Sequence, residues 1–140
     1  MGVASARVDE AALAAWGREF AGTLTPPAVI ALSGELGAGK TTLVRAIAAG
    51  LGAAGPVTSP TFALVHRYRG SRATVYHVDA YRLRPGDDVR DLGFAEMLDD
   101  PAAVVLVEWP ERLGASAPRF THHVRLAYAE DSGARLVGLA

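Results

Sequence analysis

A glycine-rich segment in the first third of the chain constrains its fold more than any other feature. Residues 34–41 read GELGAGKT and match G-x-x-x-x-G-K-[ST] at every fixed position. The apolar run AVIALSG (28–34) before it is typical of a strand that is buried on both faces. After it, residues 41–52 repeat apolar side chains at helical spacing. A strand, a glycine loop and a helix in this order predict an α/β fold.

The glycine loop contains Lys40, the only lysine among the fourteen basic residues of the chain. Glycines let backbone N–H groups point inward around a phosphate, and the start of the next helix adds its positive end. A compact ammonium fits such a loop, whereas the planar guanidinium of arginine does not. We therefore predict a phosphate cradle in which Thr41 offers its hydroxyl to Mg²⁺, and the alternative is a glycine-rich turn with an incidental lysine. The cradle comprises Glu35, Leu36, Gly37, Ala38, Gly39, Lys40, Thr41 and Thr42.

Two acidic residues stand at the ends of strand patterns further along the chain. Asp79 ends TVYHVD, and Glu108 ends the apolar run VVLVE. A phosphate-binding loop of this kind works with a carboxylate near the metal, usually at a strand end. We predict that one of the two binds Mg²⁺, directly or through water, and that the other positions the attacking water; their order stays open. The alternative for Asp79 is a strand-end cap or an ion pair with Arg82.

The absence of asparagine and the presence of a single lysine help to predict which nucleotide the chain binds. Guanine-specific switch proteins with this loop rely on an Asn-Lys-x-Asp motif, but the chain has no asparagine and its single lysine is in the loop. ATP is therefore the predicted nucleotide. Thr61, in the sequence Ser-Pro-Thr, is a candidate contact for the γ-phosphate or the metal, as in loops that respond to hydrolysis. An ordinary Ser-Pro turn is the alternative.

The remaining chain divides into short elements, with no interdomain linker and no internal repeat. At 140 residues we expect one domain over 1–140. The patterns predict a helix over 9–24, a strand around 62–68 after a Pro/Ser/Thr loop, a strand over 73–83, a short helix within 84–101, a strand over 103–110 and a hairpin over 121–140.

Composition excludes several classes of protein. The chain has no cysteine, which excludes disulfides, thiolate zinc sites and cysteine nucleophiles. Its net charge of −1 gives no global footprint for DNA, RNA or an anionic membrane. No apolar run approaches the roughly 20 residues of a membrane span, and the N-terminal residues lack a signal-peptide pattern. We therefore expect a soluble protein of the cytoplasm.

Five motifs occur in an order that resembles one known family. They are GELGAGKTT (34–42), VTSPTFALVHRY (57–68), VYHVDAYRL (75–83), DLGFAEML (91–98) and VVLVEWPERL (104–113). Together they resemble the TsaE family, the small ATPase of bacterial tRNA threonylcarbamoyladenosine (t6A) synthesis. The resemblance covers nearly the whole chain, and it implies a three-layer P-loop α/β domain with a mixed, mainly parallel sheet and C-terminal antiparallel strands.

The resemblance also implies roles and partners. Lys40 and Thr41 would hold phosphate and Mg²⁺, Thr61 would belong to a switch-like segment, and Asp79 and Glu108 would be the metal and water carboxylates. ATP would be hydrolysed to ADP and phosphate, slowly by the chain alone and faster with TsaD and TsaB. These partners would connect it indirectly to tRNA, with no membrane and no DNA involved. Two other functions stay open: a nucleotide-dependent docking module with incidental hydrolysis, and a small-molecule kinase.

An arginine that stabilises the transition state is not identified by the sequence. Arg67, Arg69 and Arg82 are candidates within the chain, a partner's arginine is equally plausible, and a solvated surface charge is the alternative for each. His77 lies two residues before Asp79, where an orienting or core histidine is favoured over a catalytic base.

Overall fold

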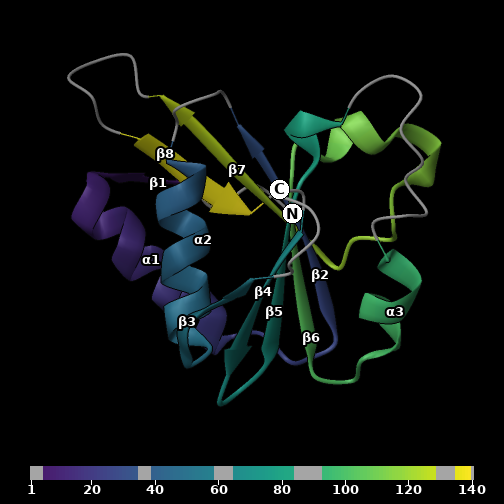
Figure 1. The fold of residues 1–140 in the computed structure, drawn as a ribbon. Helices are drawn as coiled ribbons and strands as arrows, with labels where there is room; N and C mark the ends of the chain where they lie inside the picture. The colour runs from purple at the N-terminus through teal and green to yellow at the C-terminus, as the bar shows by residue number, and fades with distance from the viewer. Residues whose placement is uncertain (1–4, 35–38, 59–64, 84–92, 129–134, 140) are drawn as a thin grey trace.

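The computed structural model describes residues 5–34, 39–58, 65–83, 93–128 and 135–139, which form one sheet with helices on both faces (Figure 1). The sheet has eight strands in the order β1-β8-β7-β2-β6-β5-β4-β3. The strands are β1 (Ser5–Val8), β2 (Ala28–Gly34), β3 (Ala53–Thr58), β4 (Val65–Gly70), β5 (Thr74–Asp79), β6 (Ala103–Glu108), β7 (His122–Tyr128) and β8 (Arg135–Leu139).

The sheet is mixed, as predicted, and its parallel part lies at the centre. β2 pairs in parallel with β6 and β7, and β5 pairs in parallel with β6. The pairings β1–β8, β7–β8, β3–β4 and β4–β5 are antiparallel. The predicted C-terminal hairpin is confirmed by β7 and β8. The parallel share is smaller than expected because β3, β4 and β5 form an antiparallel meander.

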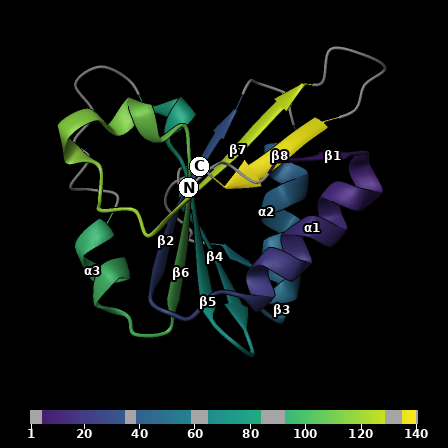
Figure 2. The ribbon, with the colours of Figure 1, turned by 180° about the vertical axis from the view of Figure 1, so that it is seen from behind.

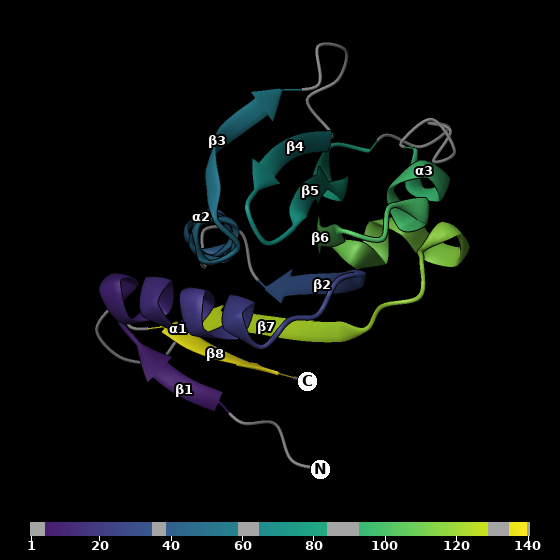
Figure 3. The same cartoon turned by 90° about the horizontal axis from the view of Figure 1, so that it is seen from below.

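The helices cover the two faces of the sheet and complete three layers (Figures 2 and 3). On one side lie α1 (Glu10–Gly22) and α2 (Lys40–Gly50), and on the other lie α3 (Phe94–Asp99) and the 3₁₀ segment η3 (Pro110–Ser116). A short 3₁₀ turn, η1 (Ala80–Arg82), follows β5 directly.

The central strand β6 contributes apolar side chains to both faces of the sheet. All six of its residues are buried. Val104 and Leu106 belong to the cluster under α1 and α2, whereas Val105 and Val107 belong to the cluster under α3 and η3. Successive side chains of a strand point to opposite faces, so Glu108 falls on the α2 face at the carboxyl end of the strand.

Helices α1 and α2 pack closely through small residues. A Cβ atom on Gly17 would lie 2.8 Å from the Cβ of Ala46, and one on Gly50 would lie 2.7 Å from the Cβ of Ala21. The glycines thus let the two helices approach closely. Helix α1 begins at the cap of Asp9, whose Oδ1 accepts a hydrogen bond from the backbone N–H of Ala12 at 2.7 Å.

Two strands differ from the sequence-based expectation. Strand β3 occupies residues that we predicted as a Pro/Ser/Thr loop, and β1 occupies residues with no predicted element. Both are edge strands, and β3 carries Pro56 next to a register shift, which an edge strand tolerates. The strand predicted around 62–68 begins at Val65 within the described residues. None of the helices described is long and apolar enough to cross a membrane.

Candidate nucleotide-phosphate site

The ends of β2, β5 and β6 and the start of α2 meet at one edge of the sheet. β5 and β6 run in parallel with Asp79 opposite Glu108, so both carboxylates lie at the same carboxyl edge. Gly34 ends β2, and Lys40 begins α2. Ligands of open α/β sheets bind at this edge. Lys40, Asp79 and Glu108, which the sequence analysis selected from separate motifs, are thus brought together.

Lys40 lies inward at the first turn of α2. It is 5% exposed, and its Nζ donates a hydrogen bond to the carbonyl oxygen of Gly34 at 2.5 Å. The same Nζ lies 3.7 Å from the centroid of the Trp109 ring, which is a cation–π contact. Burial lowers the pKa of Lys40 below its ordinary value of 10.5, and the charges of Glu108, Glu111 and Asp79 oppose that shift. The ammonium is therefore partly desolvated and surrounded by acids.

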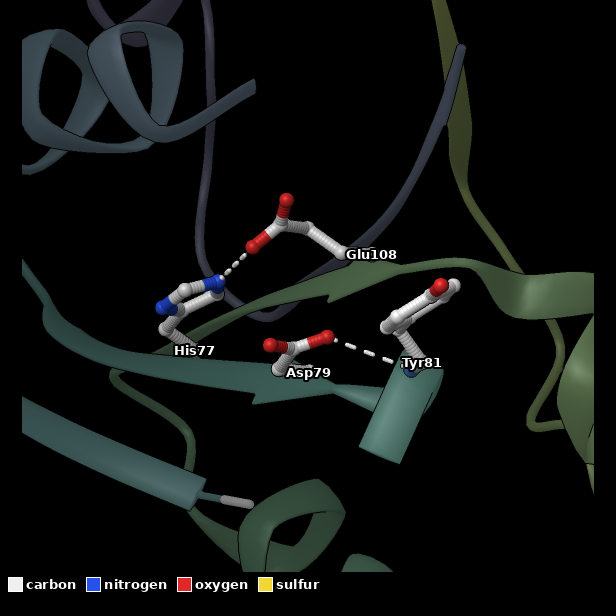
Figure 4. A network of polar contacts seen from close by, with 4 residues as sticks. All are labelled: His77, Asp79, Tyr81 and Glu108. Atoms are coloured by element: carbon white, nitrogen blue, oxygen red, sulfur yellow. Dashed lines mark hydrogen bonds and ion pairs between the residues drawn. The ribbon is translucent and has the colours of Figure 1, made fainter. Parts of the chain in front are cut away.

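Glu108 is the second buried charge of the site. It is 7% exposed, and Lys40 and Glu108 are the only buried polar or charged residues in the described part of the chain. Its Oε2 lies 2.5 Å from Nε2 of His77 on β5 (Figure 4). Asp79 lies between His77 and Tyr81 in this view, and its Oδ1 accepts a hydrogen bond from the backbone N–H of Tyr81 at 3.2 Å. That hydrogen bond bears out the strand-end cap that we named as the alternative for Asp79, and it leaves the metal role open.

A column of two aromatic rings between two cations extends from Lys40 toward the surface. Trp109 adopts the left-handed backbone conformation (φ 56°), directly after Glu108. The centroid of its ring is 5.0 Å from that of Tyr81, and Cζ of Arg112 is 5.0 Å from the Tyr81 ring centroid. The sequence analysis missed Tyr81 and Arg112. Their positions in the sequence could have indicated them, because Tyr81 lies two residues after Asp79 and Arg112 lies four residues after Glu108.

The donor set fits Mg²⁺ rather than a metal that needs an all-protein cage. Thr41, next to Lys40 at the start of α2, is exposed and carries a hydroxyl. Within the described ranges, no group of three or more His, Asp or Glu side chains is placed to hold a metal alone. Mg²⁺ prefers oxygen ligands, keeps several waters and binds through one or two carboxylates plus substrate phosphates. Thr41, Asp79 and Glu108 are compatible with that mode of binding.

The other predicted cradle residues are only partly within the described chain. Gly39 precedes α2 with φ 104°, a conformation that favours glycine, and Thr42 is half-buried. Thr42 also lines an open hollow of about 540 Å³ with Asp9, Glu10, Ala11 and Ala14. The predicted contacts Glu35, Leu36, Gly37, Ala38 and Thr61 lie outside the described residues.

Two of the three arginine candidates point away from the site. Arg67 pairs with Tyr76 across β4 and β5, and Tyr76 packs in the cluster on the α3 side of the sheet. Arg69 lies two residues after Arg67 and therefore on the same face of β4. It pairs with Thr74, at the opposite end of β5 from Asp79. Both are therefore on the wrong face to contact a ligand beside Lys40. The side chain of Arg82, the third candidate, lies outside the described residues.

The chain matches a family model along most of its length. The model, "Threonylcarbamoyl adenosine biosynthesis protein TsaE", covers residues 8–137. A protein named tRNA threonylcarbamoyladenosine biosynthesis protein TsaE from Treponema pallidum is 39% identical over 84% of this chain and 86% of its own length. The Haemophilus influenzae protein of that name is 34% identical over 89% and 81%, and the one from Synechocystis is 41% identical over 70% and 64%.

A solved structure extends the likeness to three dimensions. The crystal structure of Bacillus subtilis YdiB superposes with a TM-score of 0.75 and 27% identity, over 99% of this chain and 86% of the other. The structural match and the match to the family model both span most of this chain. The chain therefore belongs to the TsaE family.

Proposed function

We propose that the chain binds ATP with Mg²⁺ and hydrolyses it to ADP and phosphate in support of tRNA t6A synthesis in the cytoplasm. TsaD and TsaB are the proposed partners, and tRNA is contacted through them. One observation carries this proposal: the only two buried charges in the described chain, Lys40 and Glu108, lie together at the carboxyl ends of the parallel strands at the centre of the sheet. Membership of the TsaE family supports the assignment to t6A synthesis.

The chemistry of the proposed reaction is in-line attack of water on the γ-phosphorus. A P–O bond forms to water, the bond from phosphorus to the β–γ bridging oxygen breaks, and ADP leaves. Thr41, Asp79 and Glu108 would hold Mg²⁺, which would neutralise the charge that develops on the phosphates. Lys40 offers its ammonium to the same phosphates, and the cradle amides of residues 34–41 donate to them.

Glu108 and Asp79 are proposed to have different roles at the metal and the attacking water. Glu108 is our first choice for the group on the metal side that orients the attacking water, and Asp79 acts beside it, with Thr41 as a metal ligand. All three are oxygen donors near the same edge of the sheet. Thr61 is proposed as the residue that senses the γ-phosphate. The hollow lined by Thr42 and Asp9 is adjacent to the cradle and is the proposed position of the nucleoside.

The contacts of Lys40 support our proposal that the chain alone hydrolyses ATP only weakly. Its ammonium is already bonded to Gly34 and covered by Trp109, so phosphate must replace existing contacts. Within the described residues, neither Arg67 nor Arg69 faces the site. A partner that supplies an arginine or moves Trp109 would therefore raise the rate.

The test is phosphate release from Mg-ATP by the purified chain, alone and with TsaD and TsaB, with Lys40→Ala as the blank. We expect slow release alone, a strong rise with the partners, and none above background in the blank. ATP binding without release in either condition would contradict hydrolysis and favour a nucleotide-dependent docking module. A small-molecule kinase would instead require an acceptor before ATP is consumed.

Glu108→Gln separates hydrolysis from docking. The substitution keeps the size of the side chain and removes its charge. If hydrolysis is required, the variant keeps binding to TsaD and TsaB but loses multiple-turnover t6A synthesis. Retention of both would show that hydrolysis is incidental.

A further inference from the structure

We propose that His77 is a positioning residue that holds the Glu108 carboxylate in the orientation needed for its role. Its Nε2 engages Oε2 of Glu108, and the other carboxylate oxygen points away from the ring (Figure 4). The catalytic consequence of this inference rests on the proposed ATP hydrolysis, whereas the orientation of Glu108 does not.

The strand register brings the two side chains together. His77 on β5 lies opposite Leu106 on β6, and Glu108 follows two residues later on the same face. The separation between Nε2 and Oε2 is 2.5 Å, a short hydrogen bond. In Figure 4 the ring of His77 points at one oxygen of Glu108, and the other oxygen points away from the ring. Among the described residues, that second oxygen has no hydrogen-bond partner.

Packing alone does not explain a histidine at this position. The neighbours of His77 along this face are Val75, Val104 and Leu106, which are fully buried apolar side chains. The side chains of His77 and Glu108 are 12% and 9% exposed, so both are largely removed from water. A polar ring in such a row costs free energy unless it is hydrogen-bonded. Its partner is Glu108, and this contact gives the reason for histidine instead of an aliphatic residue.

A second histidine stacks against the ring of His77. His66 on β4 is the register partner of His77, and the two ring centroids are 6.1 Å apart with the planes 29° from parallel. The stack restricts rotation of the His77 ring. Fixing a glutamate side chain costs conformational entropy. The contact with His77 restricts the Glu108 side chain before the nucleotide binds, so nucleotide binding does not have to supply that free energy.

The experiment compares His77→Leu with His77→Gln, which retains an N–H donor at similar reach. With TsaD and TsaB present, we expect His77→Leu to lower kcat for phosphate release by about 10- to 100-fold, the usual loss when a group that orients a metal-site ligand is removed. The Kd for ADP without Mg²⁺ should stay within about twofold, since the cradle is intact. His77→Gln should restore most of kcat. His123→Leu, at an exposed position of β7, is the matched control and should leave kcat unchanged.

A double-mutant cycle shows whether His77 acts through Glu108. If it does, His77→Leu causes no further loss of kcat in a Glu108→Gln background. Losses that multiply would contradict positioning and indicate an independent role for His77. An unchanged kcat in His77→Leu would overturn the inference outright.

A measurement without turnover keeps the inference testable if the chain releases no phosphate or if His77→Leu does not fold. The chain has four histidines, so ¹⁵N imidazole spectra at fixed pH are simple to assign. Glu108→Gln should shift the Nε2 resonance of His77 and leave those of His122 and His123 in place. An unmoved His77 resonance would show that the contact is absent in solution. Absence of phosphate release together with a shifted resonance would contradict the proposed function and support the positioning.

Discussion

At the scale of single residues, Lys40 is the group on which the site depends. Its ammonium is buried and has two neighbours that stabilise a cation, the Gly34 carbonyl oxygen and the Trp109 ring. Neither neighbour carries a charge, so the acids nearby supply the compensating field. This arrangement leads to two predictions about Lys40.

The first prediction concerns nucleotide affinity. Lys40→Ala removes a charged donor to the phosphates, and hydrogen bonds to charged groups contribute about 1.5–3 kcal/mol. We therefore expect the Kd for ATP to rise by about 10- to 150-fold, measured by isothermal titration calorimetry. Lys40→Arg should not restore the affinity, because a planar guanidinium does not fit between Gly34 and Trp109. Wild-type affinity in Lys40→Arg would show that any cation suffices.

The second prediction concerns the pH dependence of stability. The pKa of Lys40 is lowered by burial, so between that value and 10.5 the unfolded chain binds more protons than the folded chain. Stability from this group therefore rises with pH through that window, and below it the buried charge destabilises the fold. We expect Lys40→Met to stabilise the ligand-free chain at pH 8 and to lose part of that advantage by pH 10, as measured by urea unfolding. A constant difference between pH 8 and 10 would contradict the shift.

At this scale the sequence predicted the charged groups and a histidine that orients a neighbour or lies in the core, but not the contacts between these groups. Lys40, Asp79 and Glu108 stand at motif positions that a short segment reveals. The hydrogen bond between His77 and Glu108 and the ring of Trp109 over Lys40 depend on the register of β5 and β6 and on a left-handed turn. Such contacts join segments about 30 to 70 residues apart, which no local pattern encodes.

At the scale of elements, the contact of α1 with α2 fixes where the cradle helix lies. Gly17 of α1 and Gly50 of α2 let the backbones approach closely. Helix α2 carries Lys40 and Thr41 at its first turn, so a displacement of this contact would displace both. The glycines thus have a steric role, although glycine is unfavourable within a helix.

A pair of glycine substitutions tests this role. Alanine is favoured over glycine within a helix by about 1 kcal/mol. At Gly17 we expect a net loss of up to about 2 kcal/mol instead, because the added Cβ would lie 2.8 Å from that of Ala46 and overpacking typically costs about 1–3 kcal/mol.

Gly22 provides the matched control in the same helix. A Cβ there meets nothing within 4 Å, so Gly22→Ala should stabilise the chain by about 0.5–1 kcal/mol in urea unfolding. Stabilisation of equal size by both substitutions would show that the helices separate without cost.

The elements that the sequence predicted are those with their own periodic signal. β2, α2 and β6 follow directly from apolar runs and helical spacing. β1 and β3 were missed because each is an edge strand whose hydrogen bonds come from a partner, β8 for one and β4 for the other. Their residues carry little apolar pattern, so the strand state depends on tertiary pairing.

At the scale of the whole molecule, one sheet separates two apolar clusters. The cluster under α1 and α2 contains Leu106 and Val75, and the cluster under α3 and η3 contains Val105 and Val78. Strands β5 and β6 contribute to both. We therefore predict that the two faces unfold together, as expected of a single domain over 1–140.

The two tryptophans of the chain report on the two clusters separately. Trp16 packs against the first and Trp109 against the second. Fluorescence of Trp109→Phe, which retains Trp16, and of Trp16→Phe, which retains Trp109, should give unfolding curves whose normalised shapes agree with far-UV circular dichroism of the same variant. Different midpoints by the two methods in one variant would indicate that the faces unfold in separate steps.

The contacts that Lys40 makes in the ligand-free chain also limit which ligands can bind its ammonium. A ligand gains this ammonium only by displacing it from Gly34 and Trp109, so the binding free energy is the difference between new and old partners. A single phosphate group offers little beyond what it replaces, whereas a polyphosphate offers several charged oxygens at once. We therefore expect the ligand-free arrangement to favour polyphosphates over single phosphate groups, before any recognition of a base.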